Sequence, residues 1–376
     1  MISLARLSLR REWHRFLPAV LAVGFSGLLI LAQLALLLGI FQTVSIYVDG
    51  SSADLWIGYP DASSVDLARN IPTRYEVFLR QHPEVVAVEK LTLSSVDIRR
   101  RNGATIAGTL IGLDTRPNGM MLSTLLSREL RARLNEPDSI LVDVSSVGNL
   151  QVSVGDHLEI SRKRIQVVGI VTGLAAIGGP NIITSTQTAR HLDDSLRDES
   201  ETTFLLAKLS DPAQAAHVKA ALEPQGTVRP FSIWESITLS NQSRKYWLLE
   251  TGMGIGFIFS GCIAVVIGLV ITSQTLKATV VSSLREYATL RALGVSFGQL
   301  SRVVLEQAIW IGLCGALLTT LVSYSLIHLA KLKHVLIYAP LQAYLWTSAF
   351  IITIALISGW LAVRVLKKSD PATLLR

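Results

Sequence analysis

The side chains of this chain that could carry out chemistry do not form a familiar catalytic or metal-binding pattern. Seven histidines are scattered along the sequence, and no two of them are three or four residues apart. Cys262 and Cys314 both fall in long apolar segments, so neither a CxxC metal or redox site nor a disulfide framework is expected. A group of five acidic residues could hold a cation weakly, although a solvated loop explains it better. Its members are Asp193, Asp194, Asp198, Glu199 and Glu201. We expect no metal site.

Nucleotide chemistry is not expected either. The sequence contains no GxxxxGK[ST] motif, so this chain cannot hold ATP phosphates in a P-loop, and it contains no HExxH zinc motif. The net charge of +7 could indicate a nucleic-acid partner, but the basic residues are distributed as in a membrane protein. We therefore expect a non-catalytic chain with no cofactor of its own and no nucleic-acid partner.

Apolar residues are concentrated in four segments. Half of the 376 residues are hydrophobic and the mean hydropathy is +0.44, which is too apolar for an ordinary soluble protein. Each segment reaches the roughly 20 residues that a helix needs to cross a bilayer. We predict four transmembrane helices, at residues 17–41, 251–273, 303–327 and 342–363. The first apolar run is longer than the about 7–15 residues of a signal peptide, so we interpret it as a retained anchor.

Basic residues indicate how these spans are oriented. Residues 1–16, 274–302 and 364–376 together carry 12 basic and 3 acidic residues, whereas residues 42–250 carry 21 basic and 24 acidic ones. Because Lys and Arg are enriched in cytoplasmic segments, we place the three basic segments, and both termini, in the cytoplasm. Residues 42–250 and the short loop 328–341 are then outside. The predicted fold is an integral membrane α-helical protein of the cell inner (plasma) membrane, with four transmembrane helices, 1+3, and a large inserted α+β extracytoplasmic domain.

Residues 42–250 are numerous enough to form a core of their own. Asn102-Gly103 lies between two apolar runs and predicts a β-hairpin over residues 96–114. A second strand pair is predicted over residues 154–172, turning near Arg162 and Lys163. We expect two subdomains. We also expect a continuous helical stalk that leads from residues 240–249 into the second span.

Residues 274–302 lie between two spans and yet are amphipathic. One face of a predicted helix is mostly apolar and ends in an arginine; it is formed by Val280, Leu284, Tyr287 and Arg291. Gly294 is suited to end this helix, because glycine adopts the left-handed conformation at no steric cost. Ser296 and Gln299 have the spacing of a capping box that starts a new helix. The pattern favours a short cytoplasmic helix that passes force to a soluble partner. Residues 1–16 are predicted to form an amphipathic helix at the same membrane face, and a basic topogenic tail with no further role explains them equally well.

Small residues recur every four positions at the start of the second predicted span. They are Gly252, Gly256, Ser260, Ala264 and Gly268. Such a ridge lets another helix approach closely, which is how helices associate in a bilayer. We predict that this ridge forms a transmembrane dimer interface. A second ridge in the third span could face the same chain; it consists of Ala308, Gly312, Ala316 and Thr320.

Several short stretches resemble the MacB/FtsX superfamily of ABC-transporter permeases. The resemblance is carried by EYATLRALG at residues 286–294 and LEQA at residues 305–308. YWLL at residues 246–249 and SDPA at residues 369–372 are also similar. Within the superfamily the chain is most similar to the DevC type. The likeness covers the whole architecture but is sharp only over about residues 246–308, so no ligand of the external domain can be carried over.

This resemblance implies a homodimeric permease that lies among membrane lipids and whose ATP is bound by a separate ABC ATPase dimer. The predicted amphipathic helix would then be the coupling helix that docks in a groove of the ATPase. The apolar residues that would fill that groove are Leu284, Tyr287 and Leu290. The charged residues that would set the register are Arg285, Glu286 and Arg291. Gly294 would end it. The resemblance also implies mechanotransmission, export of a lipid-like or hydrophobic substrate, and a periplasmic membrane-fusion adaptor with an outer-membrane channel.

Two other functions remain compatible with the sequence. An FtsX-like transmembrane signalling subunit would regulate an external enzyme without transport, although the external domain of that type is usually smaller than residues 42–250. A membrane-anchored receptor or enzyme that uses no ATPase is the third hypothesis. The size of the external domain favours export over the signalling function.

Overall fold

The computed structural model describes residues 13–176, 178–224, 229–282, 289, 293–332 and 335–368. The chain divides into two compact units, each of which has its own internal packing. The helical unit comprises Met1–Gly39, Gly254–Leu332 and Ile337–Arg376. The α+β domain comprises Ile40–Met253 and Lys333–Leu336.

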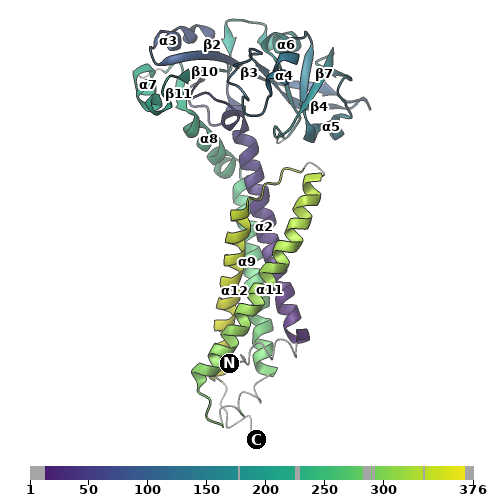
Figure 1. The fold of residues 1–376 in the computed structure, drawn as a ribbon, viewed down its shortest axis with the longest axis vertical. Coiled ribbons are helices and arrows are strands. Elements are labelled where there is room, and N and C mark those ends of the chain that lie inside the picture. Colours follow the sequence, from purple (N-terminus) through teal and green to yellow (C-terminus); the bar gives the residue numbers. More distant parts are fainter. Residues whose placement is uncertain are drawn as a thin grey trace. The chain divides into compact units, whose positions relative to one another are not determined.

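Four long apolar helices build the helical unit, and all four are long and apolar enough to cross a membrane. They are α2 (Trp13–Asp49), α9 (Met253–Ser282), α11 (Phe297–Leu332) and α12 (Leu341–Lys368). Along the chain, α2 precedes the α+β domain and the other three follow it (Figure 1). Each helix overlaps one predicted span. In most cases the helix continues past the ends of the predicted apolar run. Helical backbone hydrogen bonds form with polar side chains as well, so the apolar run does not set the helix ends.

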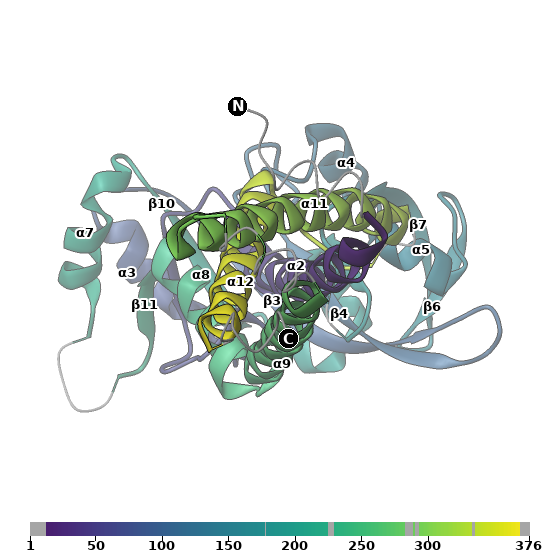
Figure 2. The same cartoon turned by 90° about the horizontal axis from the view of Figure 1, so that it is seen from below.

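Small residues bring these helices close together. A Cβ atom at Gly359 of α12 would lie 2.6 Å from Cβ of Ala308, and one at Gly312 of α11 would lie 3.1 Å from Cβ of Ala355. The second small-residue ridge of the sequence therefore packs on α12 of the same chain. Gly315 of α11 similarly approaches α2, where its Cβ would be 2.5 Å from Val23. Figure 2 shows the four helices seen along the bundle.

A mixed sheet forms the framework of the α+β domain. Within the described residues its nine strands have the order β11-β1-β10-β3-β4-β8-β5-β7-β6, and β2 pairs separately with β9. The strands are β1 (Leu55–Gly58), β2 (Ile71–Pro72), β3 (Val85–Arg99), β4 (Thr105–Leu113), β5 (Ser139–Asp143), β6 (His157–Ile160), β7 (Lys163–Val171), β8 (Asn181–Ser185), β9 (Glu201–Thr202), β10 (Phe204–Leu209) and β11 (Ser232–Glu235). The long β3 pairs with β10 along its first half and with β4 along its second. One sheet thus runs through the domain, and the division into two subdomains stays a prediction.

Both predicted hairpins are present. β3 and β4 pair from Thr92↔Gly112 to Arg99↔Thr105, and Gly103 in the turn has φ +84°. The positive φ is the reason that glycine is favoured there. β6 and β7 pair antiparallel, and the turn between them places Ser161 and Arg162 at positive φ.

Short helices complete the domain, and most of them contact strands of this sheet. They are η1 (Val65–Leu67), η2 (Thr73–Tyr75), α3 (Glu76–Gln81), α4 (Arg128–Arg133), α5 (Val144–Leu150), α6 (Thr186–Leu192), η3 (Asp194–Leu196), η4 (Pro212–Gln214), α7 (Ala215–Leu222), α8 (Ser236–Lys245) and η5 (Tyr246–Glu250). Figure 1 shows α3 and α7 at one end of the domain and α5 and α6 at the other. The largest buried cluster includes Ile46, Tyr47 and Val48, so the end of α2 is part of the domain core.

Candidate functional site

Most of the predicted ATPase-coupling residues fall outside the described residues. These are Leu284, Arg285, Glu286, Tyr287, Leu290 and Arg291. The exception is Gly294, which has φ +94°. Directly before this glycine, the backbone N–H of Leu293 donates to the carbonyl of Thr289 at 3.0 Å. Gly294 therefore has the predicted helix-ending conformation, and the docking role of the segment stays a prediction.

The capping box that starts α11 is confirmed. The backbone N–H of Gln299 donates to Oγ of Ser296 at 3.3 Å, and the N–H of Ser296 donates to Oε1 of Gln299 at 3.0 Å. Residues 294–298 also match the GxSxG spacing of a hydrolase nucleophile elbow, which requires a strand before the serine. Here the serine hydroxyl is engaged in capping the helix that follows it.

The five residues of the predicted dimer ridge have different surroundings. Ala264 and Gly268 are buried, and a Cβ atom at Gly268 would lie 2.6 Å from Oγ of Ser26 in α2. Ser260 accepts a hydrogen bond from Nε2 of Gln33, also in α2. This part of the ridge therefore packs on a helix of the same chain.

Gly256 and Gly252 differ from the rest of the ridge. A Cβ atom at either position would meet no described atom within 4 Å. Gly252 belongs to the α+β domain and has φ +76°, so its conformation reflects the end of a helix. Within the helical unit, Gly256 is the glycine of this ridge whose Cβ position is open, and the predicted dimer contact now depends on it.

Replacing Gly256 with leucine is expected to weaken homodimerisation without destabilising the single chain, because the added side chain meets no intramolecular neighbour. Gly268→Leu should destabilise the single chain by about 1–3 kcal/mol, because its side chain overpacks against α2, and should leave homodimerisation less affected. Photobleaching of single molecules in nanodiscs reports the dimer, and thermal unfolding reports the fold. A Gly256→Leu chain that dimerises as strongly as wild type would remove this glycine from the interface.

A polar cluster, here called the stalk cluster, fastens the end of α2 to α8. It consists of Ser45, Asp49, Ser240 and Arg244. The Asp49 carboxylate accepts hydrogen bonds from Nη2 of Arg244 at 2.6 Å, Oγ of Ser45 at 2.7 Å and Oγ of Ser240 at 2.7 Å. Nε of Arg244 also donates to Oγ of Ser45 at 3.1 Å. The side chains of Arg244 and Asp49 are 36% and 38% exposed, so the ion pair by itself stabilises by about 1 kcal/mol at most. The shared hydrogen bonds fix its geometry.

The connection from α8 to α9 is interrupted, so the prediction of a continuous helical stalk is wrong. α8 ends at Lys245 and is followed by the π-helical turn η5, in which the N–H of Thr251 donates to the carbonyl of Tyr246. Gly252 then adopts its positive φ, and α9 begins at Met253. The left-handed conformation ends the helix, since a right-handed helix cannot continue through it. π-helical turns are frequent at functional sites.

The side chains of the acidic cluster form hydrogen bonds and ion pairs with neighbouring residues of the chain. Asp193 and Asp198 accept backbone N–H groups of Ser195 and Ser200, both at 2.8 Å. Asp194 pairs with Arg197 and Glu199 with Arg190. These side chains close turns and form surface ion pairs, as expected of a solvated loop.

Comparison with known families matches two regions of the chain. Residues 16–225 match the MacB-like periplasmic core domain, and residues 257–371 match the FtsX-like permease C-terminal domain. The first match covers more than half of the 376 residues.

Individual proteins are similar over parts of the chain. The ABC transporter permease YtrF of Bacillus subtilis (strain 168) is 29% identical over 139 residues, which is 32% of this chain and 32% of that protein. The periplasmic region of MacB from Actinobacillus actinomycetemcomitans is 14% identical and covers 52% of this chain and 94% of that structure, with a TM-score of 0.38. The extracellular domain of the ABC-type transporter YknZ from Gram-positive bacteria is 12% identical and covers 49% and 99%, with a TM-score of 0.33.

Proposed function

Because this chain belongs to the family of ABC transporter permeases that combine a MacB-like periplasmic core domain with an FtsX-like permease C-terminal domain, we propose that it is the membrane subunit of an ABC exporter. Family membership is the observation that carries the proposal. A separate ATPase dimer would bind and hydrolyse ATP, and it would dock on the coupling helix at residues 284–291. This chain would itself be non-catalytic.

The four apolar helices are proposed to cross the inner membrane. Their length and composition allow it. The basic segments at residues 1–16, 274–302 and 364–376 would lie in the cytoplasm, because Lys and Arg are enriched on that side. The α+β domain, with its slight acidic excess, would then be extracytoplasmic.

We propose that α2 carries motion to the α+β domain. It is one helix of 37 residues, Trp13–Asp49. Its last turns are held in the domain by burial of Val48, by the stalk cluster, and by a hydrogen bond that the Tyr47 hydroxyl donates to Oδ1 of Asn181 at 2.9 Å. Moving α2 without the domain would expose apolar surface and break these bonds. The interruption at Gly252 gives the other connection the freedom to bend, so the two connections have different mechanical roles.

The finer features of the proposal come from the DevC-type resemblance. The substrate would be lipid-like or hydrophobic and need not pass between the spans. The permease would be a homodimer and would work with a periplasmic adaptor and an outer-membrane channel.

Affinity purification of the tagged full chain from its native membranes tests this function. We expect an ATPase with a P-loop and a membrane-fusion adaptor to co-purify. A cell-wall hydrolase in place of the adaptor would support the signalling function. Absence of any ATPase would contradict both.

The stalk cluster gives a test of force transmission. Asp49→Ala removes the acceptor of three hydrogen bonds, which is expected to cost the domain about 1.5–3 kcal/mol and to reduce export several-fold while ATPase association is unchanged. Asp97→Ala is the matched control, because Asp97 is exposed on β3 outside the cluster. Export rate and thermal unfolding are the measurements. Equal export by the two variants would show that the cluster does not transmit motion.

A further inference from the structure

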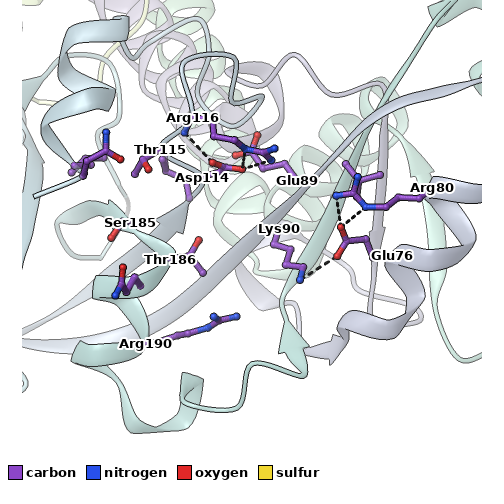
Figure 3. Close-up of a pocket in the computed structure, with 15 residues that line it drawn as sticks. Glu76, Arg80, Glu89, Lys90, Asp114, Thr115, Arg116, Ser185, Thr186 and Arg190 are labelled. Atoms are coloured by element: carbon purple, nitrogen blue, oxygen red, sulfur yellow. Dashed lines mark hydrogen bonds and ion pairs between the residues drawn. The ribbon is translucent and has the colours of Figure 1, made fainter. Parts of the chain in front are cut away.

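A polar cleft of about 420 Å³ opens in the α+β domain (Figure 3). Its walls come from α3, β3, the segment after β4, and the junction of β8 with α6. The volume is in the range of about 300–1,000 Å³ that small-molecule sites occupy. Unlike most such sites, its lining is dominated by charged and hydroxyl-bearing side chains, so a polar ligand is indicated.

Positive charge is in excess around this cleft. The basic side chains are Arg80, Lys90, Arg116 and Arg190, and the acidic ones are Glu76, Glu89 and Asp114. Glu89 is 3% exposed, and the charge of the equally buried Arg131 behind the wall acts on it. Because Arg131 offsets the charge of Glu89, the charges that remain at the cleft surface are four cations and two carboxylates.

Part of the excess positive charge lies beside Glu76. Its Oε1 accepts a hydrogen bond from Nε of Arg80 at 2.6 Å, and its Oε2 lies 3.1 Å from Nζ of Lys90. Burial alone would raise the pKa of Glu76, but the hydrogen bonds and charges of Arg80 and Lys90 outweigh it and lower that pKa. One ionised carboxylate thus faces two cations, which leaves one positive charge for a ligand. Asp114, in contrast, is matched by Arg116, to which it is paired.

Arg190 supplies a second charge from the other wall. Its side chain is 21% exposed, whereas Glu199, to which it is paired at 3.2 Å, is 84% exposed. Exposed ion pairs contribute little, so an incoming anion can replace Glu199 at small cost. Figure 3 shows Lys90 and Arg190 extending into the cleft from β3 and α6, with the side chains of Ser185 and Thr186 nearby. The Thr186 hydroxyl is a further hydrogen-bond donor, whereas Oγ of Ser185 donates to Oγ1 of Thr188 and accepts the backbone N–H of Thr188 at the start of α6.

We propose that this cleft binds a phosphate monoester group, with Lys90 and Arg190 as its charged contacts. Such a group carries about −1.5 to −2 charges at neutral pH, which matches the two available positive charges. A planar guanidinium fits two phosphate oxygens, and an ammonium acts on them as a point charge. The group can belong to a soluble phosphate ester or to a lipid headgroup. The site goes beyond the permease role.

Equilibrium dialysis of the purified full chain in detergent tests the proposal. The probes are glycerol 3-phosphate, glycerol, and the short-chain lipids dihexanoyl phosphatidic acid and dihexanoyl phosphatidylcholine. We expect the two monoesters to bind, more weakly as salt is added, and glycerol and phosphatidylcholine not to bind. Tighter binding of phosphatidic acid than of glycerol 3-phosphate assigns a lipid ligand, and equal binding assigns a soluble ester. No saturable binding of either monoester up to about 10 mM overturns the proposal.

Three variants locate the site. Lys90→Gln and Arg190→Gln should each weaken binding about tenfold, as expected for loss of one charge-assisted hydrogen bond. Glu199→Gln should strengthen binding, because it removes the competing carboxylate, and a misfolded chain cannot produce that result. Arg101→Gln is the matched control, since Arg101 pairs with Asp156 at the β3–β4 hairpin outside the cleft. If all four variants bind the phosphate monoesters with the same affinity, the assignment of the site to this cleft is refuted. Because no ATPase subunit is present, failure here is distinct from failure of the permease role.

Discussion

Leu290→Asp is expected to abolish co-purification of the ATPase subunit, while the chain still reaches the membrane in wild-type amount. The residue is predicted to insert into an apolar groove of the partner. An ionised carboxylate buried there without a partner costs several kcal/mol, which corresponds to a loss of affinity of more than about 100-fold. Tyr287→Ala should act in the same direction, since aromatic anchors often contribute about 2 kcal/mol or more to an interface. Pull-down from detergent extracts measures both.

Thr289→Asp is the control for this experiment. Thr289 lies in the same segment but on the opposite face of the predicted helix. The same charge introduced there should leave association intact. If Leu290→Asp and Thr289→Asp bind the ATPase equally, the coupling role of this face is refuted.

Arg131→Met is expected to destabilise the α+β domain by about 3–5 kcal/mol. Arg131 is 2% exposed and donates hydrogen bonds from Nη1 to the carbonyl of Asp114 at 2.7 Å and from Nη2 to the carbonyl of Met121. Its charge also acts on buried Glu89, which accepts the backbone N–H groups of Met120 and Met121. The substitution would leave a buried carboxylate without its offsetting cation and two carbonyls without these donors.

Thermal unfolding of the full chain in detergent measures this loss. Arg128→Met is the control, because Arg128 is exposed on the same helix, and it should change stability by no more than about 0.5 kcal/mol. The double variant Glu89→Gln with Arg131→Met should recover part of the loss, since no buried charge remains. An Arg131→Met chain as stable as the control would show that this network does not hold the domain together.

The pH dependence provides an independent check on Glu89. Burial raises the pKa of Glu89 despite the backbone hydrogen bonds and the charge of Arg131, which lower it. The folded state therefore retains this proton to higher pH than the unfolded state, whose pKa is about 4.3. The contribution of Glu89 to stability should fall as pH rises from that value through the raised pKa. Arg131→Met should make the fall larger, and Glu89→Gln should remove it.

The features that the sequence predicted well depend on residues close together in the chain. Four apolar runs are enough to indicate four long apolar helices, since length and hydropathy decide that property. Asn102-Gly103 indicates the β3–β4 turn because few other residues adopt a positive φ. The capping box of Ser296 and Gln299 is a contact across three residues, so spacing alone identifies it. The family resemblance at residues 286–308 is equally local.

The tertiary structure decided which partner each of these local patterns meets. The ridge from Ser260 to Gly268 has the spacing of a dimer interface, yet its neighbour is α2 of the same chain. Gly252 has the same spacing, but its backbone conformation ends the helix and interrupts the predicted stalk. Asp49 and Arg244 meet across 195 residues, and the polar cleft joins α3, β3 and α6, for which no local spacing gives a signal. Helical and turn conformations follow from neighbouring residues, whereas contacts between distant segments follow from how the sheet and the helices pack.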